Sequence, residues 1–214
     1  MAPARRAQAR ATQHSIIDAA HALFASRGYQ ATTLDDIAAA AEVSVQSVYF
    51  HFGNKPALLK RVVDVASVGD DEEVAVLDRP WVQDIRSEPD TRQALALWIR
   101  GSRAIYERVA PILAVVRQAA GVDADLKAQW ETNKRQRLVA HRQMAELLVA
   151  KEGLRPEVAV DRATDIIYTL ASPEVFLLLT EDRQWSGDDW EHFVTSSLSD
   201  ALLAAPSPLP RSRR

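Results

Sequence analysis

The chain of 214 residues contains no cysteine, which excludes disulfide bonds, thiolate nucleophiles and cysteine-based metal sites. No apolar run approaches the roughly 20 residues needed to span a bilayer. The N-terminus has arginines but lacks the apolar core of a signal peptide, so we expect a cytoplasmic protein. Aromatic residues make up only 7% of the chain, and its 47% hydrophobic and 26% charged residues are typical of a soluble globular protein.

The net charge is only −3, but the charges are unevenly distributed along the chain. Residues 1–61 carry seven Lys and Arg against four Asp and Glu, whereas the remainder carries nineteen against twenty-five. A basic N-terminal part on an acidic remainder indicates that only the former meets an anionic partner.

Apolar residues recur at helical spacing almost throughout and no strand pattern is present, so we predict an all-α fold. Near the N-terminus the predicted helices are short. Gly28 can end the first helix, and Thr33 with Asp36 forms a capping box for the second. Ser44 can cap a third helix soon afterwards. Two short helices joined by a tight turn are typical of a helix-turn-helix.

Gly and Pro divide the longer helices that follow. We predict a short helix around Trp81 and helices over 91–110, 112–120, 123–152, 156–182 and 186–203, with interruptions at Pro111 and Pro173. The patterns give four segments: a flexible basic arm at 1–11, a helix-turn-helix domain at 12–60, a larger helical domain at 61–205 and a disordered tail at 206–214. The two middle segments are called the N-terminal and C-terminal domains.

Residues 43–55, VSVQSVYFHFGNK, concentrate three aromatics, a histidine and a lysine in a chain poor in aromatics. Val48 and Phe52 are four residues apart and can face the preceding helix. The exposed side of the third helix would then carry Val45, Gln46, Tyr49 and Phe50. Exposed aromatics of this kind indicate a surface that binds a partner. The alternative is a small helical subdomain in which the aromatics only pack against one another.

DNA suits this surface. Gln46 can form paired hydrogen bonds with adenine, and a phenylalanine can contact a thymine methyl group. The residues expected to read the major groove are Val45, Gln46, Ser47 and Phe50. The residues expected to contact phosphates are Thr33, Ser44, Tyr49, His51 and Lys55, the first two beside helix N-termini.

The segment ATTLDDIAAAAEVSVQSVYFHFGNKPALL resembles the DNA-binding segment of the TetR family of bacterial transcriptional regulators. The matching residues are Gly28, Tyr29, Thr32, Thr33, Ile37, Ala38, Val43, Ser44, Tyr49, His51, Phe52, Lys55, Ala57, Leu58 and Leu59. Glu42 departs from the glycine usual in the turn, and Gln46 from a small residue. The resemblance implies a regulator, usually a repressor, that a small-molecule effector releases from a palindromic operator.

The resemblance also implies that the C-terminal domain binds the effector and forms a homodimer through its C-terminal helices. The segment 175–179 (VFLLL) is apolar on every side, and the last predicted helix carries an apolar stripe at Trp190, Phe193, Val194, Leu198, Ala201 and Leu202. These helices could pair with their twofold mates as a four-helix bundle. The alternative is that both stripes only complete the core of one subunit.

An effector pocket is predicted on the helix over 123–152, where Asn133, Arg137 and His141 interrupt an apolar stripe. This pattern fits an apolar ligand with a polar or anionic group. The predicted pocket residues are Trp98, Tyr106, Trp130, Asn133, Arg137, His141 and Tyr168. The alternative is that the aromatics are core and the polar residues face solvent.

Other classes of protein find little support. Helical bundles with two metal ions need paired Glu-x-x-His motifs, and this chain offers only Asp18-Ala-Ala-His21, so we expect no enzyme, metal or cofactor. Two nearer alternatives are a DNA-binding regulator without a small-molecule effector and a ligand-dependent activator. Arg5, Arg6 and Arg10 could enter the minor groove or belong to a solvated tail.

Overall fold

The computed structural model describes residues 3–69 and 76–204, with side chains from residue 7 onward. The helices are α1 (Pro3–Ala31), α2 (Leu34–Ala40), α3 (Val45–Phe52), α4 (Lys55–Val68), α5 (Pro80–Ser87), α6 (Thr91–Ala119), α7 (Ala124–Ala150), α8 (Val160–Leu170), α9 (Pro173–Leu177) and α10 (Gly187–Leu202). A 3₁₀ turn (Val76–Asp78) precedes α5, and a π-helical turn (Leu178–Asp182), called the π-turn, follows α9. Within the described ranges there is no strand, which confirms the all-α prediction; the tail predicted at 206–214 lies outside them.

The helix boundaries of the N-terminal domain follow from local chemistry. Gly28 has φ 78°, which favours glycine and interrupts the helical backbone near the end of α1. Thr33 and Asp36 form the predicted capping box at α2, and Ser44 and Asn54 cap α3 and α4. The fully buried side chains Ile16, Phe24, Ile37, Val48, Leu58 and Leu59 pack these four helices around one core.

Two predicted boundaries differ from the structure. Helix α1 begins at Pro3, so most of the segment expected to be a flexible basic arm is its first turns. Alanines and arginines there have high helix propensity, and an existing helix is extended at little cost. Helix α4 runs continuously across the boundary placed at residue 60, because its buried face contacts both domains.

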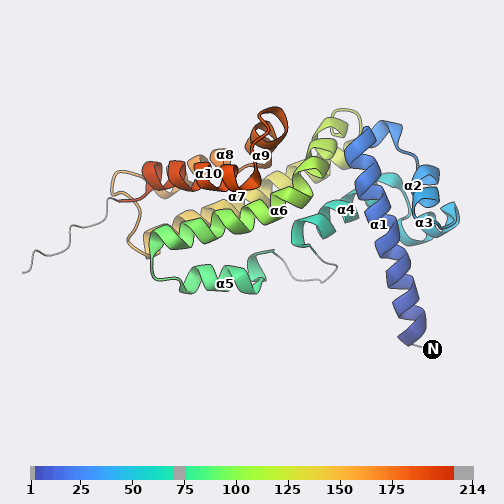
Figure 1. Cartoon of the computed structure of the whole chain (residues 1–214), viewed down its shortest axis with the longest axis horizontal. Coiled ribbons are helices and arrows are strands. Elements are labelled where there is room, and N and C mark those ends of the chain that lie inside the picture. Colours follow the sequence, from blue (N-terminus) through green and yellow to red (C-terminus); the bar gives the residue numbers. More distant parts are fainter. Residues whose placement is uncertain (1–2, 70–75, 205–214) are drawn as a thin grey trace, which may run out of the picture.

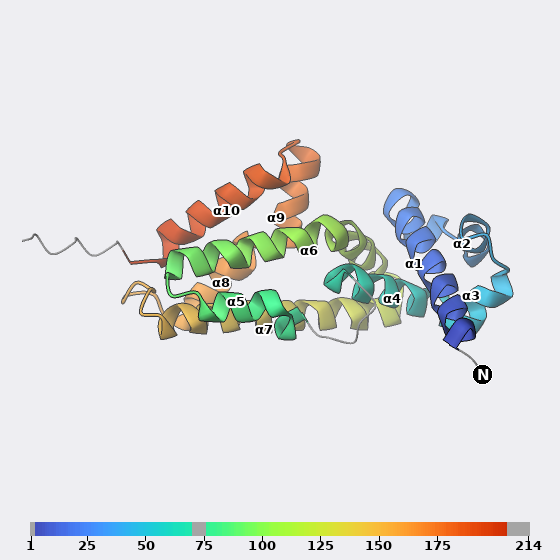
Figure 2. The same ribbon diagram turned by 60° about the horizontal axis from the view of Figure 1, so that its bottom comes forward.

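The C-terminal domain is built on the long helices α6 and α7, which pack against each other (Figures 1 and 2). Helix α5 lies along one side of this pair, and α8, α9 and α10 cover another. Helix α4 joins this domain to the N-terminal domain at the far end of the molecule and packs against α6 (Figure 1).

The break predicted at Pro111 is wrong, since α6 continues through it from Thr91 to Ala119. A proline removes only one helical hydrogen bond, and tertiary contacts can hold the helix on both sides of it. Ala110 and Ile112, which flank the proline, are both fully buried. The interruption at Pro173 is present, because α8 ends at Leu170 and α9 begins at the proline.

The stretch Val160–Asp182 has a mean hydropathy of 1.2, which meets the length and composition of a membrane span. The core of a water-soluble protein passes the same test. Here the stretch is divided between α8, α9 and the π-turn, and α8 packs against α7 and α10. These features indicate core helices of the C-terminal domain.

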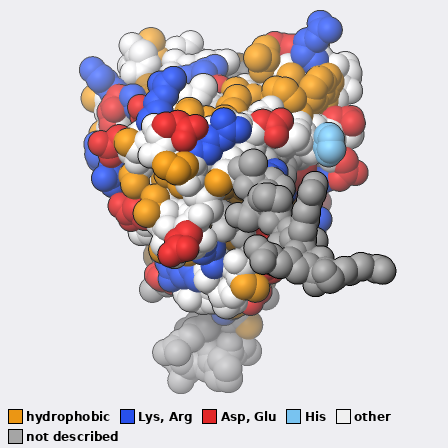
Figure 3. All heavy atoms as spheres, turned by 90° about the vertical axis from the view of Figure 1, so that its left-hand side faces the viewer, with side chains coloured by type: hydrophobic (Ala, Val, Ile, Leu, Met, Phe, Trp, Pro, Cys, Tyr) orange, Lys and Arg blue, Asp and Glu red, His pale blue; other side chains and the backbone are white. Residues whose placement is uncertain are grey.

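The apolar stripe of α10 lies mainly inside its own subunit. Trp190, Val194, Leu198 and Leu202 are fully buried, and only Phe193 among the large members is exposed, by 38%. Nor is the segment 175–179 buried all round, because Leu178 is 52% exposed. Figure 3 shows hydrophobic side chains along the upper edge of the molecule, where α9 and α10 lie in Figure 1.

Candidate functional site

Helix α3 presents its aromatic and polar side chains to solvent. Phe50 is 85% exposed and Tyr49 is 53% exposed, and Gln46 is exposed on the same helix. Val48 is fully buried against the rest of the N-terminal domain and fixes this orientation. Val45, in contrast, is half-buried against the core, so it is less available as a groove contact than predicted.

The residues expected at phosphates also hold the local structure together. The Thr33 hydroxyl donates to the Asp36 carboxylate at 2.6 Å and accepts from the Asp36 backbone N–H at 3.1 Å. These side-chain and backbone bonds lower the pKa of Asp36. The Ser44 hydroxyl accepts from the Ser47 backbone N–H at 3.2 Å and lies 3.0 Å from the Ser47 hydroxyl. Both capping hydroxyls therefore face solvent in fixed positions.

Lys55 has an internal role that its sequence pattern did not reveal. Its ammonium donates to the carbonyls of Tyr29 at 2.8 Å and Thr32 at 2.9 Å, and lies 4.2 Å from the Tyr29 ring centroid. It thereby joins the end of α1 to the start of α4. Burial lowers the pKa of Lys55, with Asp123 opposing. Two of the three N–H donors of its ammonium are used in these bonds, so one remains for a phosphate, and that contact stays a prediction.

Helix α1 supports the exposed surface of α3 through two residues that were not predicted from the sequence. The Gln13 side-chain amide donates to Nδ1 of His51 at 3.3 Å, which leaves Nε2–H of that ring as a donor. The Ser15 hydroxyl donates a hydrogen bond to the Ala41 carbonyl at 3.1 Å, which stabilises the turn between α2 and α3. In that turn Glu42 has φ 56°, a left-handed conformation that favours glycine.

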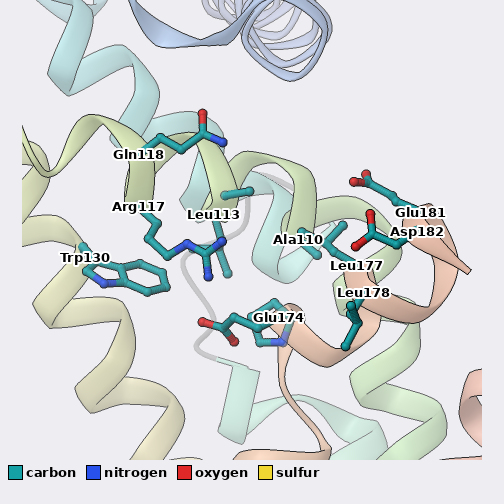
Figure 4. A pocket seen from close by; sticks show the side chains of 12 residues that line it. Ala110, Leu113, Arg117, Gln118, Trp130, Glu174, Leu177, Leu178, Glu181 and Asp182 are labelled. Carbon is teal, nitrogen blue, oxygen red and sulfur yellow. The ribbon is translucent and has the colours of Figure 1, made fainter.

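The predicted pocket residues do not line one cavity. Trp130 lines a pocket of about 380 Å³ between α6, α7, α9 and the π-turn, called the π-turn pocket (Figure 4). Trp98 lines a second pocket of about 460 Å³ beside α5. Asn133 lies between them on α7 and accepts a hydrogen bond from Gln129 at 3.2 Å.

The other four predicted residues form a buried polar cluster. Arg137 donates to the Glu174 carboxylate at 2.9 Å and to the Tyr168 hydroxyl at 2.8 Å. His141 contacts Tyr168 edge-on, with ring centroids 6.0 Å apart. The hydroxyl of Tyr106 donates to the Ala171 carbonyl at 2.7 Å. The alternative, in which the polar residues face solvent, is excluded for His141, which is only 2% exposed.

Burial controls the protonation of this cluster. Burial, together with the Arg137 charge, lowers the pKa of His141 to about 3, while the Ala171 carbonyl opposes the shift without a hydrogen bond of normal geometry. Burial disfavours the charged form of Arg137, yet bonds to Tyr168 and attraction to Glu174 leave its pKa raised. The cluster therefore holds a charged guanidinium beside a neutral imidazole.

Helix α6 connects the two domains. Nε2 of His21 on α1 donates to the Arg108 carbonyl at 3.0 Å, and Nε of Arg108 donates to the Ala66 carbonyl of α4 at 3.0 Å. Residue 108 thus holds α1 and α4 together, close in sequence to Ala110 and Leu113 of the π-turn pocket. Sequence spacing gave no sign of these contacts, which join positions 87 and 42 residues apart.

Among the described residues, no three His, Asp or Glu side chains lie close enough together to bind a metal ion. His21 of the Asp18-Ala-Ala-His21 motif is instead occupied with the Arg108 carbonyl.

Residues 16–62 match the family model of bacterial regulatory proteins of the tetR family. The probable acrEF/envCD operon repressor of Escherichia coli K12 is 42% identical over 62 residues, which are 29% of this chain and only 28% of that protein. The fold of the whole chain is that of NalD from Pseudomonas aeruginosa, the secondary repressor of the MexAB-OprM multidrug efflux pump. The TM-score is 0.66 at 20% identity, covering 91% of this chain and 98% of NalD.

The transcriptional regulator FadR of Bacillus subtilis, solved in complex with stearoyl-CoA, has the same fold. Its TM-score is 0.70 at 19% identity, covering 87% of this chain and 97% of FadR. The family model falls on α1 to α4, where the exposed aromatic helix and its capped partner lie. Over these residues the chain is similar to the tetR family of bacterial regulatory proteins.

Proposed function

We propose that this chain is a sequence-specific DNA-binding transcriptional repressor that a small-molecule effector releases from a palindromic operator. The observation that carries the proposal is the exposed face of α3, with Gln46, Tyr49 and Phe50 presented by a capped helix-turn-helix. Repression is supported by the roles of the E. coli relative and NalD, which are both repressors. A regulator of this kind acts in the cytoplasm.

In this proposal α3 lies in the major groove. Gln46 pairs with an adenine, Ser47 contacts a neighbouring base edge, and Phe50 contacts a thymine methyl group. Tyr49 and the Nε2–H of His51 donate to phosphates on either side. Ser44 adds a phosphate contact, and because its hydroxyl is held at the start of α3 it loses little side-chain entropy on binding. Thr33 adds another once its hydroxyl proton turns from Asp36 to the phosphate.

A twofold DNA site requires a twofold protein. We propose that the exposed apolar side chains Leu178, Trp185 and Phe193 form the centre of the homodimer interface, together with neighbouring residues of α8 and α10. Trp185 and Phe193 contact edge-on at 5.6 Å, so they form one apolar surface. Phe193→Asp should convert a dimer into monomers in sedimentation experiments, whereas Asp200→Asn, an exposed change on the same helix, should not.

The effector would act through α6. Ala110 and Leu113 line the π-turn pocket, and Arg108, one turn earlier, bonds to α4 and accepts from α1. A ligand that shifts this part of α6 therefore changes the position of both helices and the separation of the two recognition helices. This is a population shift between DNA-competent and incompetent dimers.

The decisive experiment is selection of duplexes from a randomised library by the purified full chain. Enrichment of a palindrome with half-sites about one helical turn apart is expected. The logarithm of affinity should then fall by about 0.9 for each neutralised phosphate per decade of salt. Failure to enrich any sequence, alone and with candidate effectors, would exclude the proposal. Enrichment only with an effector would instead identify a regulator that binds DNA when its ligand is bound.

A further inference from the structure

The π-turn pocket has an unusual wall. Its lining comes from the second half of α6, the first half of α7, α9 and the π-turn. Single π-turns within helical segments occur frequently at functional sites. The volume of about 380 Å³ lies within the range of small-molecule sites. The second pocket is slightly larger, but its two charged residues, Arg86 and Glu146, have charges that sum to zero.

One end of the π-turn pocket carries an excess positive charge. In Figure 4 the Arg117 guanidinium points into the pocket between the Trp130 ring and the Glu174 carboxylate. No ion pair of Arg117 occurs among the contacts of the described residues, whereas Glu174 is already paired with Arg137 at 2.9 Å. The two guanidiniums and one carboxylate sum to one positive charge, which a single anionic group would neutralise.

Arg137, which is paired with Glu174, and the nearby neutral His141 carry unpaired polar atoms. Nε of Arg137 and both ring nitrogens of His141 are buried without a hydrogen-bond partner. Buried polar atoms are normally paired, so each unpaired one calls for an explanation. Arg137 is paired with Glu174, which lines the pocket. A ligand group that accepts hydrogen bonds and lies beside Glu174 would allow the Arg137 guanidinium to turn toward the ligand.

The remainder of the pocket differs in chemistry. Leu113 and Leu177, both half-buried, supply an apolar lining next to the charged end. Glu181 and Asp182 lie on the opposite side in Figure 4, and both are exposed. A second anionic group on the ligand would meet these carboxylates and be repelled.

We infer that the π-turn pocket binds an amphiphilic monocarboxylate, whose carboxylate pairs with Arg117 and whose apolar part lies on Leu113 and Leu177. This inference rests on the proposed function, since it names the chemical class of the effector. Arg117 is suited to the task because a guanidinium binds a carboxylate through two parallel hydrogen bonds. Glu181 and Asp182 exclude dicarboxylates.

The test is calorimetric titration of the full chain with three probes that share one alkyl chain: decanoate, decan-1-ol and decyltrimethylammonium. Decanoate should bind most tightly. Arg117→Gln should weaken decanoate binding by about tenfold, which corresponds to one charged hydrogen-bonded pair. The matched control is Arg92→Gln, an exposed arginine of the same helix outside the pocket, which should change the affinity less than about twofold.

Three outcomes would overturn the inference. In the first, decanoate and decan-1-ol bind with equal affinity. In the second, Arg117→Gln leaves the decanoate affinity unchanged. In the third, decyltrimethylammonium binds more tightly than decanoate, and the double substitution Glu181→Gln, Asp182→Asn abolishes its binding. The last would assign a cationic effector. The enriched duplex is bound in a parallel assay without probes. If the protein binds the duplex but none of the probes, the proposed carboxylate ligand is wrong and the proposed repressor function stands. If it binds decanoate but no duplex is enriched, the proposed repressor function is wrong.

Discussion

The capping hydroxyls of the N-terminal domain and the polar cluster of the C-terminal domain differ in exposure and in how far along the chain their partners lie. In the N-terminal domain the capping hydroxyls of Thr33 and Ser44 are exposed, and their partners lie three residues away. In the C-terminal domain Arg137 reaches Tyr168 and Glu174, which lie 31 and 37 residues away, and the Tyr106 hydroxyl reaches a carbonyl 65 residues away. A DNA surface can be assembled from one short segment, whereas a pocket needs several helices.

The largest expected effect tests whether α10 belongs to the core of its own subunit. Trp190 is fully buried and contacts Phe176 and Tyr106, with ring centroids 5.3 and 5.8 Å apart. Trp190→Ala should lower the free energy of unfolding by about 3–5 kcal/mol, because it leaves a large cavity. Denaturant unfolding measures this. Phe193→Ala, three positions later but exposed, is the matched control and should cost less than about 1 kcal/mol in the monomer. Similar losses for both would show that the comparison of buried and exposed faces fails.

The next prediction concerns the exposed surface of α3. Gln46→Ala should weaken binding to the selected duplex by about 1–3 kcal/mol and relax specificity at one base pair. Because Gln46 is exposed, the free energy of unfolding should stay within about 0.5 kcal/mol. Competition binding with single-base variants of the duplex measures specificity. An equal loss of affinity on every sequence would instead assign Gln46 to the phosphates.

The buried cluster predicts a pH dependence of stability that comes from His141. The folded pKa of His141 is lowered to about 3, below its unfolded value near 6.5. The unfolded chain therefore binds the extra proton first as the pH falls, and stability present above pH 6.5 is lost progressively toward pH 3. Between pH 6.5 and 5 the loss from this residue should be roughly 2 kcal/mol.

Denaturant unfolding at several pH values measures this loss, and His141→Gln should remove most of the dependence in that interval. Exposed His192→Gln is the matched control and should leave the dependence unchanged. A wild-type profile that is flat between pH 6.5 and 5 would contradict the buried, neutral imidazole.

The smallest effect concerns the turn between α2 and α3. Glu42 adopts φ 56°, which costs an L-residue about 1–2 kcal/mol, while glycine adds about 0.4–1 kcal/mol of unfolded-state entropy. Glu42→Gly should therefore stabilise the protein by roughly 0.5 kcal/mol. Thermal unfolding measures the gain. Glu42→Ala should give no such gain, because alanine keeps the strain; equal effects of both substitutions would argue against it.

Much of the N-terminal domain could be predicted because its signals are local. Gly28, Thr33, Ser44 and Asn54 each fix a helix end through their own backbone or a neighbour within four residues. The exposed side of α3 followed from helical spacing once Val48 was placed inward. Lys55 was harder to predict, since its bonds to the carbonyls of Tyr29 and Thr32 cross 26 and 23 residues.

The sequence by itself determined the helical periodicity, the caps and the recognition segment, because each depends on side chains within about two helical turns. Only the tertiary structure decided that Pro111 continues a helix, that α10 buries its stripe in its own subunit, and that Arg117 and Glu174 face one pocket. Those features depend on which distant helices pack together, and burial, charge pairing and cavity shape come from that packing.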